Sequence, residues 1–437
     1  MRFISRFAGI LLAVALAGGA RADDANYRPY VVGGRAAGMG GAFTALADDG
    51  SGPWYNPGGL GFVRRSQLSL SGSVYGLVTG KHNDVLGAGH AFSYRDLNTF
   101  PVSTSAVWKL GENDVPEGDG TALALSVFVP DAIRTDDRDK LGSNQNAFFL
   151  STEQQTIWMG PTWSRRWGRL GIGASAFFLY GTTLSQFELT AVSSTSPSQF
   201  ATLTARVDET TYGFVGAVGL RWDATEDLRF GLSAYSPEIG WGSRRAFFRI
   251  ATGDNGAGQP ANITVVNADN LTASPTLPLR VQAGVAWSFD KLLLTADAIY
   301  LGKREVRNDQ DRAAEGLDHR VKRNAVLNGA VGLEYWLTRS VPLHMGLYTD
   351  LAASDSPAAS PPGTTNPNAD NTLHVNRYGG TLALGLRTAH TATDAGLNVS
   401  YGTGTDLAAN NLDFADLRPT PTRQLLLYVF LASAYEF

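Results

Sequence analysis

Hydrophobic and polar residues alternate along most of the chain, in segments of about ten residues separated by polar or turn-forming stretches. In Arg280–Phe289, valine, alanine, tryptophan and phenylalanine occupy every second position, and mostly polar residues or glycine lie between them. A period of two residues is typical of a β-strand with one apolar and one polar face. The pattern predicts about fourteen strands, at Gln67–Val78, Thr99–Lys109, Thr121–Pro130, Thr152–Trp163, Leu170–Leu189, Ala201–Trp222, Leu228–Pro237, Pro278–Phe289, Leu292–Leu301, Asn324–Trp336, Val341–Asp350, Tyr378–Thr388, Asp394–Tyr401 and Arg423–Glu436.

The predicted connections alternate between short and long. Asp290–Lys291 and Leu337–Ser340 are short, whereas Asp131–Ser151, Glu238–Leu277 and Gly302–Arg323 are long. Short turns at one end and long loops at the other are typical of outer-membrane barrels. A soluble β-sandwich would show the same alternation with its apolar face inward, but loops of this length count against a compact soluble domain. We therefore predict a transmembrane antiparallel β-barrel over residues 66–437, with lipid against its apolar face.

Tryptophans near the predicted strand ends fit the aromatic girdles of such a barrel, although a packed core would also hold tryptophan. They are Trp108, Trp158, Trp163, Trp167, Trp222, Trp287 and Trp336.

The N-terminus predicts export. Arg2 and Arg6 precede the apolar run Ile10–Ala17, and residues 20–22 have the A-x-A form of a cleavage site, so residues 1–22 are interpreted as a signal peptide. The apolar run is too short for a membrane-spanning helix. A signal peptide followed by a barrel predicts the outer membrane of a Gram-negative bacterium.

Composition narrows the possible functions. The 437-residue chain has a net charge of −4, and removal of the arginine-containing signal would make it more acidic, which argues against nucleic acid as a partner. It has no cysteine, which excludes disulfides, thiolate metal sites and cysteine catalysis.

The segment Gly33–Val63 departs from the strand pattern because ten of its residues are glycine. Glycine allows tight folding and close approach of backbones, and Asn56-Pro57-Gly58 is a strong turn signal. The segment is therefore expected to be compact, irregular and narrow. We predict that residues 23–65 form a hatch that plugs the barrel lumen.

This segment resembles the N-terminal hatch of the outer-membrane long-chain fatty acid transporter family, the FadL/TodX group of hydrophobic-compound channels. The family usually has alanine where Gly58 stands. The resemblance implies that the hatch is the gate. The matching residues proposed for that gate are Gly33, Arg35, Gly38, Met39, Gly40, Gly41, Phe43, Asp48, Asp49, Asn56 and Pro57.

The resemblance also implies a function and a route. A channel of this family takes up hydrophobic small molecules passively, with long-chain fatty acids expected first, and movement of the hatch opens the path. A kinked third strand provides a lateral exit in the family, and here Pro130 ends the predicted third strand.

Two sets of residues are candidate ligand contacts. Arg280 or Arg387 on the lumen face would bind a carboxylate through two parallel hydrogen bonds. The alternative is that they are paired charges in a polar lumen, together with Arg229, Asp297, Asn328, Glu334, His344 and Asn398. Apolar residues of the outer loops could form a groove for an acyl chain, namely Phe148, Phe149, Trp241, Phe247 and Phe248.

No motif indicates catalysis, a metal or a cofactor. The chain lacks G-x-S-x-G and H-E-x-x-H, and its six histidines have no ligand spacing. We expect a protein that is not an enzyme, has no cofactor or metal, and is a monomer. The expected partners are a hydrophobic ligand, outer-membrane lipid or lipopolysaccharide, and the barrel assembly machinery during biogenesis.

Three other functions are compatible with a barrel. The first is a non-transporting barrel that acts as a surface assembly or protein-secretion partner. The second is an aqueous porin, which the glycine-rich plug argues against. The third is a barrel lipase or acyltransferase, which the absence of a Ser/His arrangement argues against.

Overall fold

The structure is a computed structural model of the chain. It describes residues 26–27, 30–82, 92–98, 102–111, 119–140, 147–192, 199–255, 262–309, 319–358, 373–410 and 413–437. The predicted signal peptide lies outside these residues.

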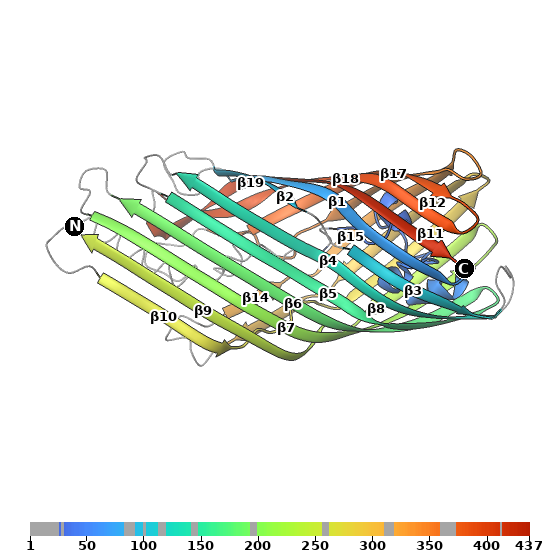
Figure 1. Cartoon of the computed structure of the whole chain (residues 1–437), viewed down its shortest axis with the longest axis horizontal. Helices are drawn as coiled ribbons and strands as arrows, with labels where there is room; N and C mark the ends of the chain where they lie inside the picture. The colour runs from blue at the N-terminus through green and yellow to red at the C-terminus, as the bar shows by residue number, and fades with distance from the viewer. Residues whose placement is uncertain are drawn as a thin grey trace.

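The described chain forms one antiparallel sheet that closes into a barrel around an N-terminal hatch (Figure 1). Strands β1 (Gln67–His82) and β19 (Asp413–Glu436) close it, and their pairing runs from Gln67↔Glu436 to His82↔Thr422. The other wall strands are β2 (Phe92–Asn98), β3 (Val102–Leu110), β4 (Gly120–Lys140), β5 (Ala147–Trp167), β6 (Leu170–Val192), β7 (Gln199–Asp223), β8 (Leu228–Tyr235), β9 (Ile239–Asn255), β10 (Asn262–Leu271), β11 (Arg280–Phe289), β12 (Leu292–Leu301), β15 (Val326–Trp336), β16 (Pro342–Asp350), β17 (Leu373–Arg387) and β18 (Thr391–Asn410).

The barrel has fourteen strand positions, as predicted. Three positions are each occupied by two consecutive strands. For example, β2 and β3 both pair with β1, and β8 and β9 both pair with β7. The third such pair is β10 and β11, which pair with β9 and β8 respectively. An even number of strands in a closed sheet leaves no long unpaired edge around the wall.

Several predicted loops were wrong because they are largely strand. Strands β4 and β5 stay paired out to Lys140↔Ala147, within the predicted loop Asp131–Ser151. The predicted loop Glu238–Leu277 contains β9 and β10, and a separate hairpin of β13 (Arg304–Asn308) and β14 (His319–Arg323) lies within Gly302–Arg323. Strand extensions of this kind need no apolar face where both sides meet polar surroundings, so a search for alternation misses them.

The two faces of the wall have the predicted chemistry. In β11, Gln282 and Ala286 are buried on the inner face, whereas Ala283 and Trp287 are exposed on the outer face. The exposed tryptophans Trp108, Trp163, Trp167, Trp222 and Trp287 lie near strand ends on the outer face. Trp158 differs, because its side chain is buried on the inner face and packs in the core. A core role was the alternative for these tryptophans, and Trp158 has it.

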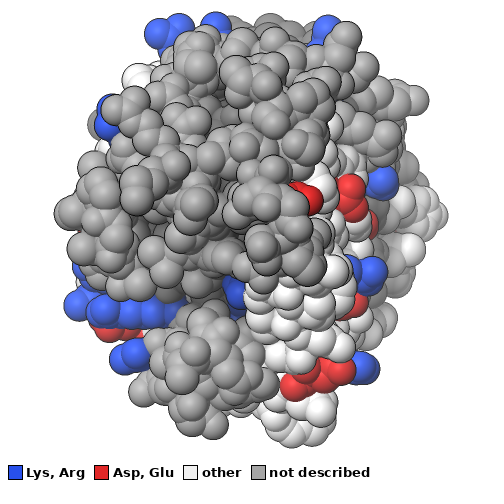
Figure 2. Space-filling model, turned by 90° about the vertical axis from the view of Figure 1, so that its left-hand side faces the viewer, with Lys and Arg blue, Asp and Glu red and all other residues white. Residues whose placement is uncertain are grey.

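The connections between strands are short at one end of the barrel and long at the other (Figure 1). We call the end with the short connections, such as Asp290–Lys291, the turn end, and the end with the long hairpins, such as β6–β7, the hairpin end. Figure 2 shows the hairpin end, where Lys and Arg side chains occur around the described rim with Asp and Glu beside some of them. Arg320 pairs there with Glu305 at 2.6 Å and Lys322 with Asp355 at 2.6 Å. Charges of both signs therefore lie close together on the described part of this rim.

The described part of the hatch contains three short helical segments, α2 (Arg35–Gly38), α3 (Gly52–Tyr55) and the 3-10 helix η2 (Pro57–Phe62). Its apolar residues Met39, Phe43 and Leu46 are buried in one cluster with Phe177 and Val215 of the wall. No helix among the described residues is long and apolar enough to cross a membrane. The core of the molecule is thus the contact between hatch and inner wall.

Candidate functional site

The inner wall accepts the hatch backbone at glycine positions. A Cβ atom at Gly231 of β8 would lie 2.7 Å from the Cα atom of Ala45, and one at Gly346 of β16 would lie 2.7 Å from the Cα atom of Gly40. Real Cβ atoms do not approach other heavy atoms so closely. Glycine is required at both positions because the hatch backbone fills the space of the missing side chain. The hatch is therefore fitted directly against strands on several sides of the barrel.

Ion pairs fix the same part of the hatch. Arg35 donates to both carboxylate oxygens of Glu334 on β15, at 2.6 and 3.1 Å, and to Asp48 at 3.0 Å. Asp48 also accepts from Arg221 of β7 at 3.2 Å. Burial raises the pKa of Asp48, but Arg35 and Arg221 outweigh burial and lower it to about 2. The network joins two hatch positions to two wall strands.

Backbone amides of the hatch meet a wall carboxylate as well. Asp297 of β12 accepts hydrogen bonds from the amides of Phe43 and Thr44, both at 2.9 Å, and from the Thr44 hydroxyl at 2.6 Å. Hydrogen bonds to a carboxylate are shorter and stronger than bonds between neutral groups. Three of the predicted gate residues, Arg35, Phe43 and Asp48, are therefore anchored to the wall.

Arg387 lies at the turn end, below the hatch. It donates to Asp394 at 2.8 Å, and Asp394 contacts Nε2 of the buried His344 at 3.2 Å. The Nδ1 atom of His344 lies 3.4 Å from Glu334, which also binds Arg35. Arg387, Asp394, Glu334 and Arg35 line a cavity of about 930 Å³ on the turn side of the hatch. Here Arg387 has the paired arrangement expected for a polar lumen. In the described part of the chain, no group of three or more acidic or histidine side chains is placed to hold a metal ion.

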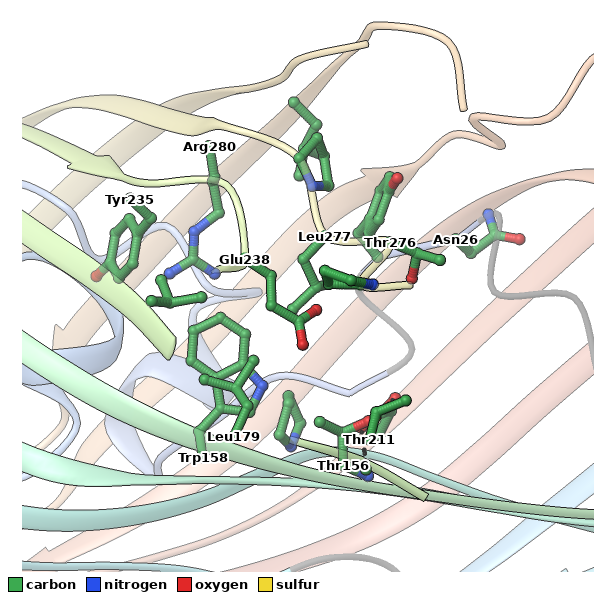
Figure 3. A pocket seen from close by; sticks show the side chains of 18 of the residues that line it. Asn26, Thr156, Trp158, Leu179, Thr211, Tyr235, Glu238, Thr276, Leu277 and Arg280 are labelled. Carbon is green, nitrogen blue, oxygen red and sulfur yellow. Dashed lines mark hydrogen bonds between the residues drawn. The ribbon is translucent and has the colours of Figure 1, made fainter. Parts of the chain in front are cut away.

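A second cavity of about 160 Å³ lies on the hairpin side of the hatch (Figure 3), and we call it the hairpin-side cavity. Trp54 of the hatch forms its floor, and Trp158, Leu179 and Val215 form an apolar wall. The ring centroids of Trp54 and Trp158 are 5.0 Å apart in an edge-to-face arrangement. A concave site with an apolar lining and a few polar groups is the usual form of a small-molecule site.

Arg280 borders this cavity and contacts the hatch. Its Nη2 atom donates to the carbonyl of Trp54 at 3.1 Å, and its guanidinium carbon lies 3.6 Å from the ring centroid of Tyr235 and 4.6 Å from that of Trp54. The hydroxyl of Tyr235 donates to the same carbonyl at 2.7 Å, and Ser233 donates to the carbonyl of Tyr55 at 2.7 Å. The last carbonyls of a helix lack partners within it, so these wall residues cap α3.

The predicted outer-groove residues lie elsewhere. Trp241 is 72% exposed and packs against Phe214 and Phe178 on the outer face. Phe248 is also exposed, whereas Phe247 is buried with Val207 and Leu271. None of these residues, nor Phe149, lines the hairpin-side cavity, and the side chain of Phe148 lies outside the described residues. Their role in an external groove stays a prediction.

The wall changes its pairing beside the cavity. Strand β3 pairs with β4 from Leu110↔Thr121 to Thr104↔Val127, and within the described ranges no β-pair joins β4 to β2. The register between β4 and β5 shifts between Phe128 and Asp131, around Pro130. Pro130 lines the hairpin-side cavity, and a small space of about 30 Å³ beside Val129 reaches Val31 and Phe430. The prediction that the strand ends at Pro130 was wrong, because β4 continues to Lys140 with the register shift at this position.

Two residues of the hairpin-side cavity, Trp158 and Glu238, are not predicted by the sequence to lie in a ligand site. Trp158 was interpreted as a girdle residue, although counting by twos from the outward Trp163 leaves it on the inner face. Glu238 was placed in a loop because it follows Pro237 at the end of a predicted strand. Its buried position in the cavity depends on the bend between β8 and β9, which alternation does not predict.

The described architecture is that of a transmembrane β-barrel whose lumen holds a folded hatch. No family model matches the chain, and no curated protein matches it. Solved structures do. A Pseudomonas aeruginosa FadL homologue aligns with a TM-score of 0.65 and 14% identity, covering 94% of this chain and 100% of that one.

Two other solved structures are similar. The Pseudomonas putida toluene transporter TodX gives a TM-score of 0.62 at 14% identity, covering 94% of this chain and 99% of TodX. The Ralstonia pickettii toluene transporter TbuX gives 0.58 at 13% identity, covering 93% and 98%. The chain thus has the FadL/TodX-type fold, as the hatch sequence predicted.

Proposed function

We propose that this protein is an outer-membrane channel for passive uptake of hydrophobic small molecules. The observation that carries the proposal is the hairpin-side cavity, which has an aromatic and aliphatic wall beside polar groups, is floored by the hatch, and adjoins the irregular pairing at Pro130. Solved structures with the same fold include proteins described as toluene transporters, which supports this class of ligand. Long-chain fatty acids, implied by the hatch resemblance, stay a prediction.

The segment before Arg35 is the part of the hatch proposed to move. Its contacts include neutral hydrogen bonds, such as Tyr30 to the carbonyl of Ala132 at 3.3 Å and the amide of Val31 to the Tyr428 hydroxyl at 3.2 Å, and the packing of Val32 in the core. Each such bond contributes only about 1 kcal/mol. The hatch body from Arg35 onward has buried ion pairs with the wall in addition. Displacing the N-terminal segment therefore costs less than moving the whole hatch.

The proposed route follows from this difference. A ligand would enter from the hairpin end and occupy the hairpin-side cavity beside Val31. Displacement of residues 30–34 would then join this cavity to the space beside Val129 and Phe430. The ligand would leave through the wall near Pro130 or continue past the hatch. No energy source is needed because the ligand moves down its own gradient.

Uptake into cells tests the proposal. Cells whose own hydrophobic-compound channels are deleted would express this protein, and uptake of labelled toluene and labelled oleate would be measured at early times. Faster uptake than in cells with an empty vector is expected for at least one of them. The matched control is the same barrel with a hairpin-side cavity filled by Val215→Trp, which should return uptake to the background rate. Background uptake of both ligands by the unmodified protein at normal surface levels would contradict the proposal.

A further inference from the structure

Glu238 places a carboxylate inside the hairpin-side cavity. It lies on the connector between β8 and β9, its side chain is buried with the residue only 8% exposed, and Figure 3 shows the carboxylate pointing into the cavity. A Cβ atom at Gly213 of β7 would lie 2.9 Å from Cγ and 3.1 Å from Cδ of Glu238. The glycine therefore leaves the space that this side chain occupies.

Other charged residues around the cavity have side-chain or hatch partners. Asp131 accepts from Thr156 at 3.1 and 3.2 Å, and Glu209 lies 3.8 Å from Arg245. Arg280 binds the hatch carbonyl of Trp54.

Glu238 differs from these residues. Its carboxylate forms no ion pair within the described ranges: the backbone of Leu277 supplies a hydrogen bond to it, and Arg304 donates to the backbone carbonyl of Glu238 at 3.2 Å. An ionised carboxylate has about four acceptor positions, so one backbone donor leaves most of its capacity unused. Burial of a carboxylate without further donors is costly. The cavity therefore offers a strong acceptor to whatever enters it.

The size of the cavity limits that occupant. Its volume is about 160 Å³, close to the roughly 150 Å³ of an engineered apolar cavity that binds benzene. The rings of Trp54 and Trp158, with centroids 5.0 Å apart, line it, and Phe128 packs behind them with its centroid 5.7 Å from that of Trp54. Such a space fits one aromatic ring with a small substituent, and a long acyl chain would need an opened form.

We propose that Glu238 determines specificity, and that the cavity selects a compact aromatic molecule that carries a hydrogen-bond donor, in the simplest case a phenol. The ring packs against Trp54 and Trp158, which already touch each other, and its hydroxyl donates to the Glu238 carboxylate. A hydrogen bond to an ionised oxygen is about twice as strong as a neutral one, and because burial disfavours the ionised form of Glu238, the preference should be largest at alkaline pH. The same carboxylate repels a ligand carboxylate. This inference rests on the proposed channel function and names its ligand class.

Binding of four matched ligands tests the inference. The probes are p-cresol, 4-methylanisole, toluene and p-toluate, which share one methylated ring and differ in its substituent. Binding to the purified full chain in detergent would be followed by tryptophan fluorescence, since Trp54 and Trp158 line the cavity. We expect p-cresol to bind at least about tenfold more tightly than 4-methylanisole, as the loss of one charge-assisted hydrogen bond implies. The p-toluate should bind most weakly.

Variants assign the preference to one side chain. Glu238→Leu should remove the preference for p-cresol over 4-methylanisole, and Glu238→Gln should reduce it, because an amide oxygen still accepts but carries no charge. Gly213→Ala should also reduce it by displacing the carboxylate. Glu226→Gln, in the exposed turn between β7 and β8, is the control and should keep the full preference. Heat-modifiable migration on gels would verify that each variant is folded, and Glu238→Gln decides the matter if Glu238→Leu does not fold.

Two failures can be distinguished. Equal binding of p-cresol and 4-methylanisole, or an unchanged preference in folded Glu238→Gln, would overturn the role of Glu238 while toluene uptake still supported a channel. Absence of binding by all four ligands would overturn the inference as well. If uptake into cells were then also at background, the proposed function would fall with it.

Discussion

Arg35 of the hatch and Glu334 of β15 are 299 positions apart in the chain, yet two hydrogen bonds of 2.6 and 3.1 Å join their side chains. Glu334 is nearly fully buried, so its charge depends on this partner. Truncation of one member of a buried pair costs about 3–5 kcal/mol, because the other charge stays buried. We predict that Arg35→Ala lowers the free energy of opening of the hatch by roughly this amount while the barrel stays closed. Hydrogen exchange of the amides of residues 36–48 would measure this free energy.

The exposed pair Arg320–Glu305 is the matched control. Its atoms are also 2.6 Å apart, but its side chains are 47% and 41% exposed. Solvent-exposed pairs contribute about 0–1 kcal/mol, so Arg320→Ala should change stability by no more than this. Similar losses in the two variants would show that burial is not what makes the hatch contact strong.

The acid stability of the hatch should depend on Asp48. Its pKa is lowered from 3.8 to about 2 because Arg35 and Arg221 outweigh the effect of burial. A lowered pKa in the folded state stabilises the hatch above the ordinary pKa of aspartate, and this contribution is lost as the pH falls through the folded value. Protection of hatch amides should therefore be constant from about pH 5 upward and decrease between about pH 4 and pH 2.

Asp49 provides the neighbouring comparison. Burial raises its pKa, although Ser51 donates to it at 2.6 and 2.8 Å. Protonation of Asp49 thus favours the folded hatch and cannot cause the acid-induced loss. We expect Asp48→Asn to remove the loss of protection between about pH 4 and pH 2, and Asp49→Asn to retain it. The same acid profile in both variants would assign the loss to other groups.

Close packing at the wall predicts a steric effect. The Cβ atom of Gly231→Ala would lie 2.7 Å from the Cα atom of Ala45, so either the hatch or β8 must shift. Overpacking of this kind costs about 1–3 kcal/mol. The control is Gly216→Ala on β7, where a Cβ atom meets nothing within 4 Å. Proteolysis at increasing temperature would measure the temperature at which the hatch unfolds. Gly231→Ala should lower this temperature, and Gly216→Ala should leave it unchanged.

Much of the wall was predictable because strand alternation is a local property. Arg280 and Gln282 lie on the same face of β11, and this follows from the alternation alone, whatever position β11 has in the barrel. The lengths of the long hairpins were underestimated, because the alternation of apolar and polar residues does not continue along the sequence to pairs such as Arg138↔Phe149. Contacts across the lumen were not predictable, because the pairing of Arg35 with Glu334 or of Trp54 with Arg280 depends on closure of the whole sheet. Glu238 enters the cavity only through the bend after Pro237.

Two crosslinks would separate movement of the N-terminal segment from movement of the whole hatch. The chain has no cysteine, so paired substitutions can be joined without side reactions. Val31→Cys with Phe430→Cys would tie the N-terminal segment to β19, because both residues line the same small space. Ala45→Cys with Ala286→Cys would tie the hatch body to β11 within the core cluster. A short bifunctional maleimide would form each link, and mass spectrometry would measure its yield.

The two links should have opposite effects on uptake. The hatch body is already held by the Asp297 hydrogen bonds and by Arg35, so the link at Ala45 removes little freedom and uptake should continue at nearly the unlinked rate. The link at Val31 fixes a segment whose described hydrogen bonds include the one from the Val31 amide to Tyr428, and uptake of labelled toluene should fall to the background of empty-vector cells. Single-cysteine variants treated with the same reagent control for modification alone. If the link at Ala45 stopped uptake and the link at Val31 did not, the hatch would move as one body, as the family resemblance implied.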